Sequence, residues 1–508
     1  MDYLPFISLE TWILLITCIG VFVMYGKGTY KTFEKLGIPG PKPIMYWGTV
    51  GRHNVYYLDD KECARKYGRV WGGYELTKPV LAVMDPDMLK TILVKECLTY
   101  FTNRRNFLLN GELYDAVNLA EDDHWRRLRN ILSPNFSSGH IKEMFSIMKH
   151  HSHKLTTSLQ SKADLFIVGS SFFGAYTIDV MASCVFSVDM DSTSNPSSPT
   201  PFITHLSKLF RFSLLPFMFA AWFPIFLPVL ELLGVSLFPR STTTFFQGFV
   251  EKVRAERNGS SHQNSGDFLQ NMINTQAANG PTNKTQNKGL TDHEIISQVT
   301  MLLFAGYETS ATTLVLLAYS LARNPEVMKR LQHKFLVEES TSTFSLFHFG
   351  PVQYEALMQM EYLDSVVSEC LRLYPPAGRL ERIAKETVKI NGVTIPKNML
   401  VMIPVYALHH DPELWPEPEE FKPDRFSKQN KQNINQYTYL PFGFGPRNCI
   451  GMCFALVMVK LALVEVLQNY SFSVCEETEI PLTMDPHGSV GPKNPIKLKL
   501  VTCSVDCN

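Results

Sequence analysis

The chain has 508 residues, 45% of them hydrophobic and 12% aromatic, and its 48 basic and 48 acidic residues give a formal net charge of zero. This balance lacks the basic excess typical of nucleic-acid binding, so we expect no nucleic-acid partner. The length allows several domains or one large domain with a large core. The ten cysteines form no CxxC pair and no dense framework, which is typical of reduced thiols in a domain that faces the cytosol.

The N-terminus carries a predicted membrane anchor, residues 1–26. The run Leu4–Tyr25 is long enough to span a bilayer, and Glu10 is its one charged residue. Asp2 and Glu10 precede its uncharged part, Thr11–Tyr25, and lysines follow it. Because positive charge marks the cytoplasmic side, we expect the N-terminus in the lumen and the rest of the chain in the cytosol. A cleaved signal peptide is the alternative, disfavoured by the charge order and by the lack of a small-residue cleavage site.

Residues 27–44 are predicted to form a basic and proline-rich hinge, and residues 45–508 the main domain. The prolines of Ile38–Pro43 fix φ and restrict the residues before them, which makes this segment stiff and extended. The apolar residues of the main domain recur mostly with the period of a helix. Strands are expected only in short runs, at Val70–Tyr74, Val80–Val83, Val388–Ile390 and Leu400–Ile403. The predicted fold class is therefore mainly α with a small β part.

A helix that starts with acidic residues is predicted at Glu121–Arg129. Trp125 and Arg129 are four positions apart, so they share one face of this helix. Arg126 and Arg127 lie off that face. A docking patch for an acidic partner and simple solvation are equally open interpretations of these two arginines.

The segment Phe212–Leu230 contains no charged residue, yet we do not predict a second membrane span there. Its prolines, Pro216, Pro224 and Pro228, argue against one straight helix. We expect short segments that dip into the surface of a bilayer or roof an apolar pocket.

A long buried helix is predicted to start at Thr291, because Thr291 and Glu294 have the spacing of a capping box. With the next proline at position 325, the helix would have roughly 29 residues and a length of ~44 Å. Glu308 is the only charge between Val299 and Ala322. A membrane span is the alternative, but an acid in mid-span costs about 2.5–3.5 kcal/mol on insertion scales, so we favour a core helix.

A loop rich in glycine and proline, Leu440–Gly451, precedes an apolar helical segment. Its Cys449 is therefore expected where a loop meets a helix N-terminus, a place that favours negative charge. A thiol there should ionise more readily, and a thiolate is the form that binds a metal. The alternative, a small buried hydrophobic cysteine, is disfavoured by the unusual loop around it.

This loop resembles the cysteine-ligand loop of the cytochrome P-450 superfamily at Phe442, Gly445, Arg447, Cys449 and Gly451. Further segments resemble other motifs of that family. They are Ala305–Thr309 for oxygen activation, Trp125-x-x-x-Arg129, Glu369-x-x-Arg372, and Pro423–Phe426 with Asp in place of Glu. The chain looks most like the vertebrate family 3 enzymes, subfamily A, from the anchor to about Leu500.

The resemblance implies a haem b whose iron is held by the thiolate of Cys449, which would favour O–O cleavage. It also implies roles for other residues. Thr309 with Glu308 would manage proton delivery, and Glu369, Arg372 and Arg425 would form a structural network. Haem contacts would come from Arg104, Trp125, Arg129, Arg382, Arg447 and Phe442. The substrate pocket would be lined by Phe107, Asn118, Phe304, Ala305, Pro376, Ala377 and Leu380. Gly306 would leave room for a ligand against the backbone.

By resemblance, the protein is expected to be a monooxygenase of the endoplasmic reticulum membrane, with residues 45–508 as a haem-binding catalytic domain on the cytosolic face. It would insert one oxygen atom from O₂ into apolar substrates such as steroids and xenobiotics. NADPH–cytochrome P-450 reductase would supply electrons, with cytochrome b5 as a second candidate partner. Two alternatives are a haem-thiolate isomerase acting on peroxides, disfavoured by the presence of Thr309, and a non-enzymatic haem sensor or carrier.

The chain departs from the subfamily pattern in a few places. Cys453 stands where arginine is usual, Phe444 where serine is usual, and the roof segment around Phe210 and Ser213 differs. These departures concern the range of substrates and the affinity for partners.

Overall fold

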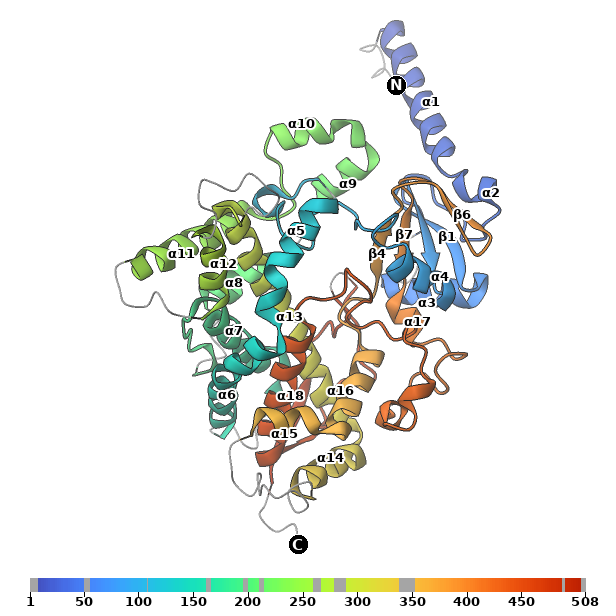
Figure 1. Ribbon diagram of the computed structural model, residues 1–508. Coiled ribbons are helices and arrows are strands. Elements are labelled where there is room, and N and C mark those ends of the chain that lie inside the picture. The colour runs from blue at the N-terminus through green and yellow to red at the C-terminus, as the bar shows by residue number, and fades with distance from the viewer. Residues whose placement is uncertain are drawn as a thin grey trace, which may run out of the picture.

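The protein is built mainly from α-helices, and the strands β1, β4, β6 and β7 lie together at one side of the molecule (Figure 1). This computed structural model describes residues 8–49, 55–106, 108–160, 166–194, 200–209, 214–258, 266–277, 289–337, 352–486 and 489–503. The predicted fold class, mainly α with a small β part, is confirmed. Phe107, Phe210 and Ser213 lie outside the described residues.

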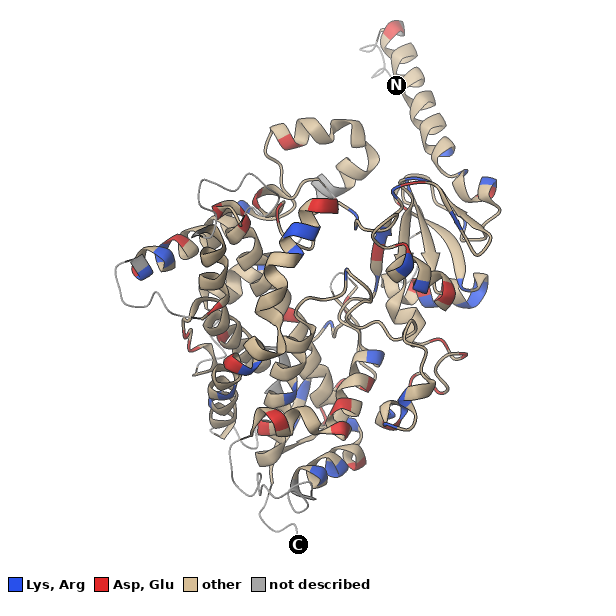
Figure 2. Ribbon diagram, viewed as in Figure 1, with Lys and Arg blue, Asp and Glu red and all other residues tan. Residues whose placement is uncertain are grey.

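Helix α1 (Leu9–Thr29) begins at Ser8, whose hydroxyl accepts the backbone N–H of Thr11. It projects away from the rest of the protein (Figure 1), and Figure 2 shows no charged residue along its middle. Among the described residues, three helices are long and apolar enough to cross a membrane. Two of them, in Asp292–Arg323 and Met452–Asn469, are 67% buried within the protein, whereas the window in Glu10–Leu36 is only 6% buried. Only the N-terminal helix is therefore free to span a bilayer.

The predicted hinge is partly helical and packs on a sheet. Helix α2 (Thr32–Leu36) follows α1 directly, and only the proline-rich part after Gly37 lacks helix and strand up to Pro43. Phe33 is buried against Gly72, where a Cβ would lie 2.1 Å from its ring. The N–H of Gly72 also donates to the carbonyl of Pro39 at 2.8 Å. These contacts fix the hinge against the domain, so it is not a free linker.

The largest sheet has the order β1 (Val70–Glu75), β2 (Lys78–Val83), β7 (Leu400–Ile403) and β4 (Leu380–Ile383). All neighbours are antiparallel except β2 and β7, which are parallel and come from distant parts of the chain. β5 (Val388–Ile390) and β6 (Val393–Ile395) form a hairpin whose turn, Asn391-Gly392, has positive φ at both positions. A third sheet, β3 (Phe166–Val168), β9 (Lys497–Thr502) and β8 (Tyr470–Ser473), had no individual prediction.

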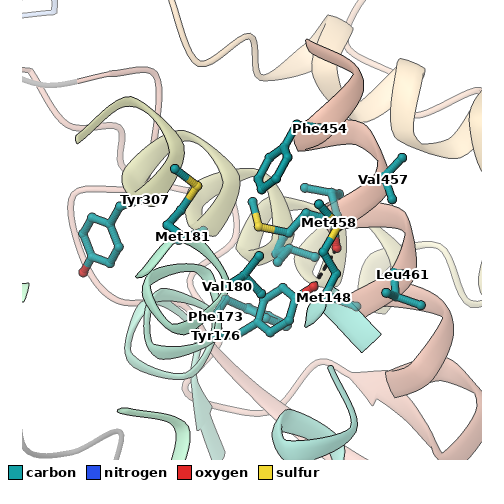
Figure 3. Close-up of a cluster of buried hydrophobic side chains, with 14 of the residues drawn as sticks. Met148, Phe173, Tyr176, Val180, Met181, Tyr307, Phe454, Val457, Met458 and Leu461 are labelled. Atoms are coloured by element: carbon teal, nitrogen blue, oxygen red, sulfur yellow. Dashed lines mark hydrogen bonds between the residues drawn. The ribbon is translucent and has the colours of Figure 1, made fainter. Parts of the chain in front are cut away.

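Helix α13 (Asp292–Arg323) is the central helix, and its 32 residues slightly exceed the predicted length. The capping box is present: Thr291 Oγ1 accepts the Glu294 N–H at 3.1 Å, and Glu294 Oε2 accepts the Thr291 N–H at 2.8 Å. α13 packs on α7 (Gly169–Phe186), α16 (Glu361–Leu373) and α18 (Met452–Asn469). The buried side chains of this core interlock α6 (Ser138–Gln160), α7 and α18 (Figure 3), where the Tyr176 hydroxyl donates to the Met458 carbonyl at 3.0 Å.

The charge-free segment forms separate short helices, as expected: α9 (Leu214–Trp222), η5 (Pro224–Phe226) and α10 (Leu227–Leu232). Several of their apolar residues are exposed, among them Ile225 at 81% and Leu232 at 88%. The Tyr25 hydroxyl on α1 donates to the Trp222 carbonyl at 3.4 Å, and Trp222 Nε1 donates to the Tyr46 carbonyl at 2.8 Å. The exposed apolar segment is thus joined to the base of the N-terminal helix.

The other helical elements complete the fold around this core. They are α3 (Tyr56–Tyr67), α4 (Pro86–Lys90), η1 (Thr91–Lys95), η2 (Gly111–Leu113), α5 (Asp122–Leu132), η3 (Ser133–Phe136), η4 (Ser192–Ser194), α8 (Pro201–Leu209), α11 (Arg240–Asn258), α12 (Phe268–Ala277), α14 (Pro325–Val337), α15 (Tyr354–Gln359), α17 (Val405–His409), η7 (Pro423–Phe426) and η8 (Lys431–Asn433).

Candidate functional site

The cysteine loop ends at the N-terminus of α18, as the sequence predicted. The Cys449 N–H donates to the Phe442 carbonyl at 2.8 Å, and the Asn448 N–H donates to the Gly445 carbonyl at 3.0 Å. Gly445 has φ +75°, and a Cβ there would lie 1.9 Å from the Leu93 carbonyl oxygen, so only glycine fits. These contacts hold the loop in one conformation, with Cys449 three residues before Met452, where α18 begins.

The Cys449 side chain is exposed, although protein surrounds it closely. Burial raises the pKa of its thiol, while the Gly451 N–H and the nearby cations Arg104 and Arg129 act in the opposite direction. The Gly451 N–H at the helix N-terminus therefore acts in the predicted direction, although burial raises the pKa of the thiol overall.

Helix α13 is open to solvent in its middle, although most of its length is buried. Ala305 is exposed and Phe304 and Thr309 are half-buried, whereas Leu303 and Ala311 on either side are buried. The Thr309 hydroxyl donates to the Ala305 carbonyl at 2.7 Å. An exposed patch in the middle of a core helix requires a cavity beside it, and this cavity is lined by the predicted oxygen-activation segment.

Gly306 and Glu308 belong to the same segment of α13. A Cβ on Gly306 would lie 2.5 Å from the Met181 sulfur, so glycine here serves the close packing of α13 on α7. The prediction that Gly306 makes room for a ligand is wrong on the side where a Cβ would stand, because Met181 of α7 fills that space. Burial raises the pKa of the Glu308 carboxyl, to which Thr312 is hydrogen-bonded, so Glu308 holds its proton to a higher pH than an exposed glutamate.

Four predicted haem contacts, Arg104, Arg129, Arg382 and Arg447, form a cluster of cations near the cysteine loop. Arg447 donates from Nε to the Thr102 carbonyl and from Nη2 to the Ala120 carbonyl, both at 2.7 Å. Arg104 Nη2 donates to the Arg447 carbonyl at 2.9 Å. Arg129 Nη1 donates to the Asn448 carbonyl at 2.8 Å. Hydrogen bonds therefore tie two of the guanidinium groups, those of Arg104 and Arg129, to the loop that carries Cys449, and Arg447 ties this loop to the segment before α5.

No carboxylate of the described residues forms an ion pair with the cation cluster. None of the ion pairs between described residues includes any of its four arginines. The Nε atoms of Arg104 and Arg382 are buried without a hydrogen-bond partner. Burial and the neighbouring cation Arg104 lower the pKa of Arg382 to about 10 and that of Arg447 to about 9. Such a site needs bound negative charge, and two carboxylates would match the planar guanidinium groups.

Trp125, another predicted haem contact, lies in α5 with the Arg447 guanidinium 4.2 Å from its ring centroid. Trp125 is buried, so this cation–π contact helps to hold Arg447 where the anion would bind. Phe442 is half-buried at the start of the cysteine loop. An exposed thiol on the cysteine loop, with nearby cations that form no ion pair among the described residues, fits a haem with a thiolate ligand and two propionates.

The predicted pocket residues come from several elements. Asn118, Phe304, Pro376 and Leu380 are half-buried, whereas Ala305 and Ala377 are exposed. The Asn118 Oδ1 atom is buried without a hydrogen-bond partner, so a polar group on a ligand could donate to it. Phe107 lies outside the described residues.

The loop that carries Asn118 is fastened to the first turns of α13. Gln298 accepts the Val117 N–H at 2.8 Å and donates to the Asp115 carbonyl at 2.6 Å. Glu294 is buried and accepts from Arg127 and His124 of α5. Arg127 is therefore committed to an internal ion pair, which leaves only Arg126, paired with Asp123, from the predicted basic docking patch.

The structure brings together the predicted network of Glu369, Arg372 and Arg425. Arg372 donates to both Glu369 oxygens, at 2.8 and 2.9 Å, and both side chains are fully buried. Arg425 Nε donates to Glu369 at 3.2 Å. Sequence reasoning missed His409 as a fourth member: its ring lies between the Arg372 carbonyl and the Leu440 N–H. A lone histidine in an apolar segment gives no signal that distinguishes this role.

Comparisons with known proteins agree with the class that the site defines. The family model for cytochrome P450 matches residues 38–500, and the chain belongs to this family. It is 54% identical over 501 residues to cytochrome P450 3A30 of Fundulus heteroclitus, covering 98% of this chain and 99% of that protein. It is 53% identical to cytochrome P450 3A27 of Oncorhynchus mykiss (98% and 96% covered) and 46% identical to cytochrome P450 3A29 of Sus scrofa (99% and 98%). The protein is a haem-thiolate monooxygenase, and the resemblance to subfamily A of family 3 is confirmed.

Proposed function

We propose that Cys449 is the thiolate ligand of the haem iron and that Arg104, Arg129, Arg382 and Arg447, with Trp125, hold the haem propionates. The observation that carries this proposal is the cluster of cations without a protein anion beside the cysteine loop. When bound, the haem supplies the oxygen activation. The chain positions the haem and the substrate, excludes water from the site and delivers protons.

On this proposal, Thr309 and Glu308 manage the protons of the reaction. The Thr309 hydroxyl lies on the cavity side of α13 and donates to the Ala305 carbonyl. It can exchange that bond for one to a water molecule, since Ser and Thr hydroxyls rotate freely. Glu308 holds its proton to a higher pH because it is buried, which suits a group that delivers protons near neutral pH.

The substrates proposed are apolar small molecules such as steroids and xenobiotics. The supporting features are the phenyl ring of Phe304, the small side chains of Ala305 and Ala377, and Leu380 at the cavity, with Asn118 as an isolated polar atom. Apolar walls with few polar groups are typical of sites that take such ligands.

Electrons are proposed to come from NADPH through a flavoprotein, NADPH–cytochrome P-450 reductase, with cytochrome b5 as a second donor. The test is turnover in a reconstituted system that contains the protein, reductase, NADPH and a steroid. We expect NADPH consumption that rises with substrate and matches the formation of a hydroxylated product. Conversion of an organic peroxide into an isomer with neither reductase nor NADPH, and no hydroxylation with them, would refute the proposal.

The protein is proposed to reside in the endoplasmic reticulum membrane, with α1 as its anchor and the catalytic domain on the cytosolic face. The exposed residues Ile225, Leu232 and Leu233 add a second apolar surface, joined to α1 through Trp222. Deletion of residues 1–26 should weaken binding to liposomes, and Leu232→Asp with Leu233→Asp in the deleted form should abolish it. Unchanged flotation of the doubly altered protein would contradict this role for α10.

A further inference from the structure

Two clusters of described residues have the spacing of metal ligands, far from the cysteine loop in sequence. The cluster of Asp115, His124 and Glu294 is already satisfied. Arg127, His124 and the Thr291 N–H all bind Glu294, and His293 binds Asp115. These internal ion pairs and hydrogen bonds engage the side chains of the cluster, so we do not consider it further as a metal site.

The second cluster joins the C-terminal half of α6 to the loop that follows α7. His150, His151 and Asp189 each offer one ligand atom, and these atoms lie within 4.8 Å of one another. His150 and Asp189 are exposed, with His150 Nε2 at 3.9 Å from Asp189 Oδ2, whereas His151 is buried. The site therefore has one buried ligand and two exposed ones.

The protonation of His151 can be derived from its neighbours. His151 Nε2 lies 2.8 Å from the Ser183 hydroxyl, and that hydroxyl donates its own proton to the Val188 carbonyl at 3.0 Å. The serine oxygen must then accept, so Nε2 carries the proton of the imidazole. Nδ1 is left with a free lone pair.

This lone pair has no protein partner: Nδ1 of His151 is buried and makes no hydrogen bond. A metal-ligating histidine usually donates its second N–H to a fixed oxygen, and Ser183 supplies that oxygen here. An unpartnered buried acceptor requires an explanation, and a bound cation provides one.

The loop that carries Asp189 is held in place on α7. Asp179, fully buried, accepts the N–H groups of Ser192 and Thr193, each at 2.9 Å. The Asp191 N–H in turn donates to Asp189 Oδ1 at 3.0 Å, which leaves Oδ2 for other partners. The carboxylate is thus oriented before any ligand binds.

We propose that His151 Nδ1, His150 Nε2 and Asp189 Oδ2 form a zinc site on the surface of the protein. Two imidazoles and a carboxylate are the ligands of many zinc centres, whereas calcium and magnesium prefer oxygen alone. Ligand atoms at ~2.0–2.1 Å from a tetrahedral ion lie about 3.3 Å apart, so His150 and Asp189 would have to close by less than ~2 Å. Water would take the fourth position.

One competitor for the site is already present. Lys154 Nζ donates to Asp189 Oδ2 at 2.9 Å and to Asp191 Oδ1 at 2.7 Å. Zinc would displace the ammonium group from Asp189 and leave it on Asp191. Removal of the lysine charge should therefore strengthen zinc binding, an effect that simple loss of a surface charge elsewhere would not produce.

The test is calorimetric titration of zinc alone into the full-length, haem-loaded protein without a histidine tag, with zinc content measured after dialysis. We expect one ion to be lost, or its affinity to fall about tenfold or more, in His150→Ala and in Asp189→Asn. Lys154→Met should raise the affinity several-fold. His153→Ala is the matched control, since His153 is exposed on the same helix outside the cluster.

Zinc should also raise the thermal midpoint of the parent and not that of Asp189→Asn, because an ion that binds only the folded state stabilises it. Equal binding by the parent, His150→Ala and Asp189→Asn would overturn the proposal. So would a parent that binds no zinc tighter than ~10⁻⁴ M, or a Lys154→Met variant with weaker binding than the parent.

Discussion

The backbone N–H of Leu440, at the start of the cysteine loop, donates to Nε2 of the buried His409 at 2.9 Å. The other ring nitrogen, Nδ1, lies 3.1 Å from the Arg372 carbonyl, which can only accept, so Nδ1 carries the proton. Burial, with the neighbouring His410, holds the pKa of His409 well below its usual range, and the ring is neutral. One histidine thus connects the Glu369–Arg372 pair to the loop of Cys449.

His409→Ala should therefore loosen the cysteine loop. It leaves the Leu440 N–H buried without a partner, which costs about 1–3 kcal/mol in the free energy of unfolding. We expect a reduced haem content in the purified protein, measured as haem per chain. His410→Ala is the control, because His410 is buried next to it but bonds the Tyr406 carbonyl and not the loop. Equal haem content in both variants would contradict the role of His409.

Glu369→Ala should lower the haem content more than His409→Ala does, because it leaves the fully buried Arg372 without its counter-charge. Breaking a buried pair on one side costs about 3–5 kcal/mol. The expected result is failure to incorporate haem, read from the absorption spectrum after expression. A double change, Glu369→Gln with Arg372→Met, removes both charges and should recover part of the stability. Normal haem content in Glu369→Ala would show that the network does not support the loop.

Arg382→Met should release haem faster than the parent. Its guanidinium group is buried, its Nε lacks a partner, and its lowered pKa marks a cation that needs an anion. Loss of one charge-assisted hydrogen bond of about 1.5–3 kcal/mol predicts roughly 10–100-fold faster transfer of haem to an acceptor protein. Arg126→Met, on the exposed face of α5, should transfer haem at the parent rate. Identical rates for both variants would remove Arg382 from the haem site.

The stability of the protein should fall in acid partly through Glu294. Although burial raises its pKa, its bonds to His124, Thr291 and Arg127 outweigh this effect and lower it to about 2. A carboxylate with a lowered pKa stabilises the fold above its unfolded value and loses that contribution as the pH falls from about 4.5 to about 2. Glu294→Gln should remove about 1–2 kcal/mol at neutral pH, allowing for solvent screening, and should flatten the plot of unfolding free energy against pH in this range. If the free energy of unfolding fell equally with pH in the parent and the variant between pH 5 and 2, the lowered pKa of Glu294 would be contradicted.

Thr309→Ala should separate NADPH consumption from product formation. The hydroxyl on the cavity side of α13 is lost, while the apolar walls and the cation cluster stay. We expect most NADPH to be consumed without hydroxylated product, and Thr309→Ser, which keeps the hydroxyl, to couple the two as in the parent. The ratio of product to NADPH measures this. An unchanged ratio in Thr309→Ala would exclude proton management by Thr309.

Features set by short-range chemistry could be predicted from the sequence. The capping box at Thr291, the glycine- and proline-rich loop before α18 and the proline breaks around α9 and α10 are local patterns, and the structure contains each of them. The short strands β1, β2, β5 and β7 also lie where their apolar runs predicted.

Features that depend on distant partners could not be predicted. Strands β3, β8 and β9 become a sheet only when residues near position 167 meet the C-terminus. Arg127 looks solvated in the sequence until Glu294, 167 residues later, comes to face it. The thiol pKa of Cys449 also depends on how much protein surrounds it, and the burial that raises this pKa comes from segments distant in the sequence.

The measurement that tests the central claim most directly is the absorption spectrum of the reduced, carbon-monoxide-bound protein beside its Cys449→Ser variant. Thiolate ligation by Cys449 predicts a strongly red-shifted Soret band in the parent and none in the variant. Cys453→Ser, the control one helical turn later, should keep the band of the parent. A histidine-like band in the freshly prepared parent, or a red-shifted band that survives Cys449→Ser, would contradict the assignment of the ligand.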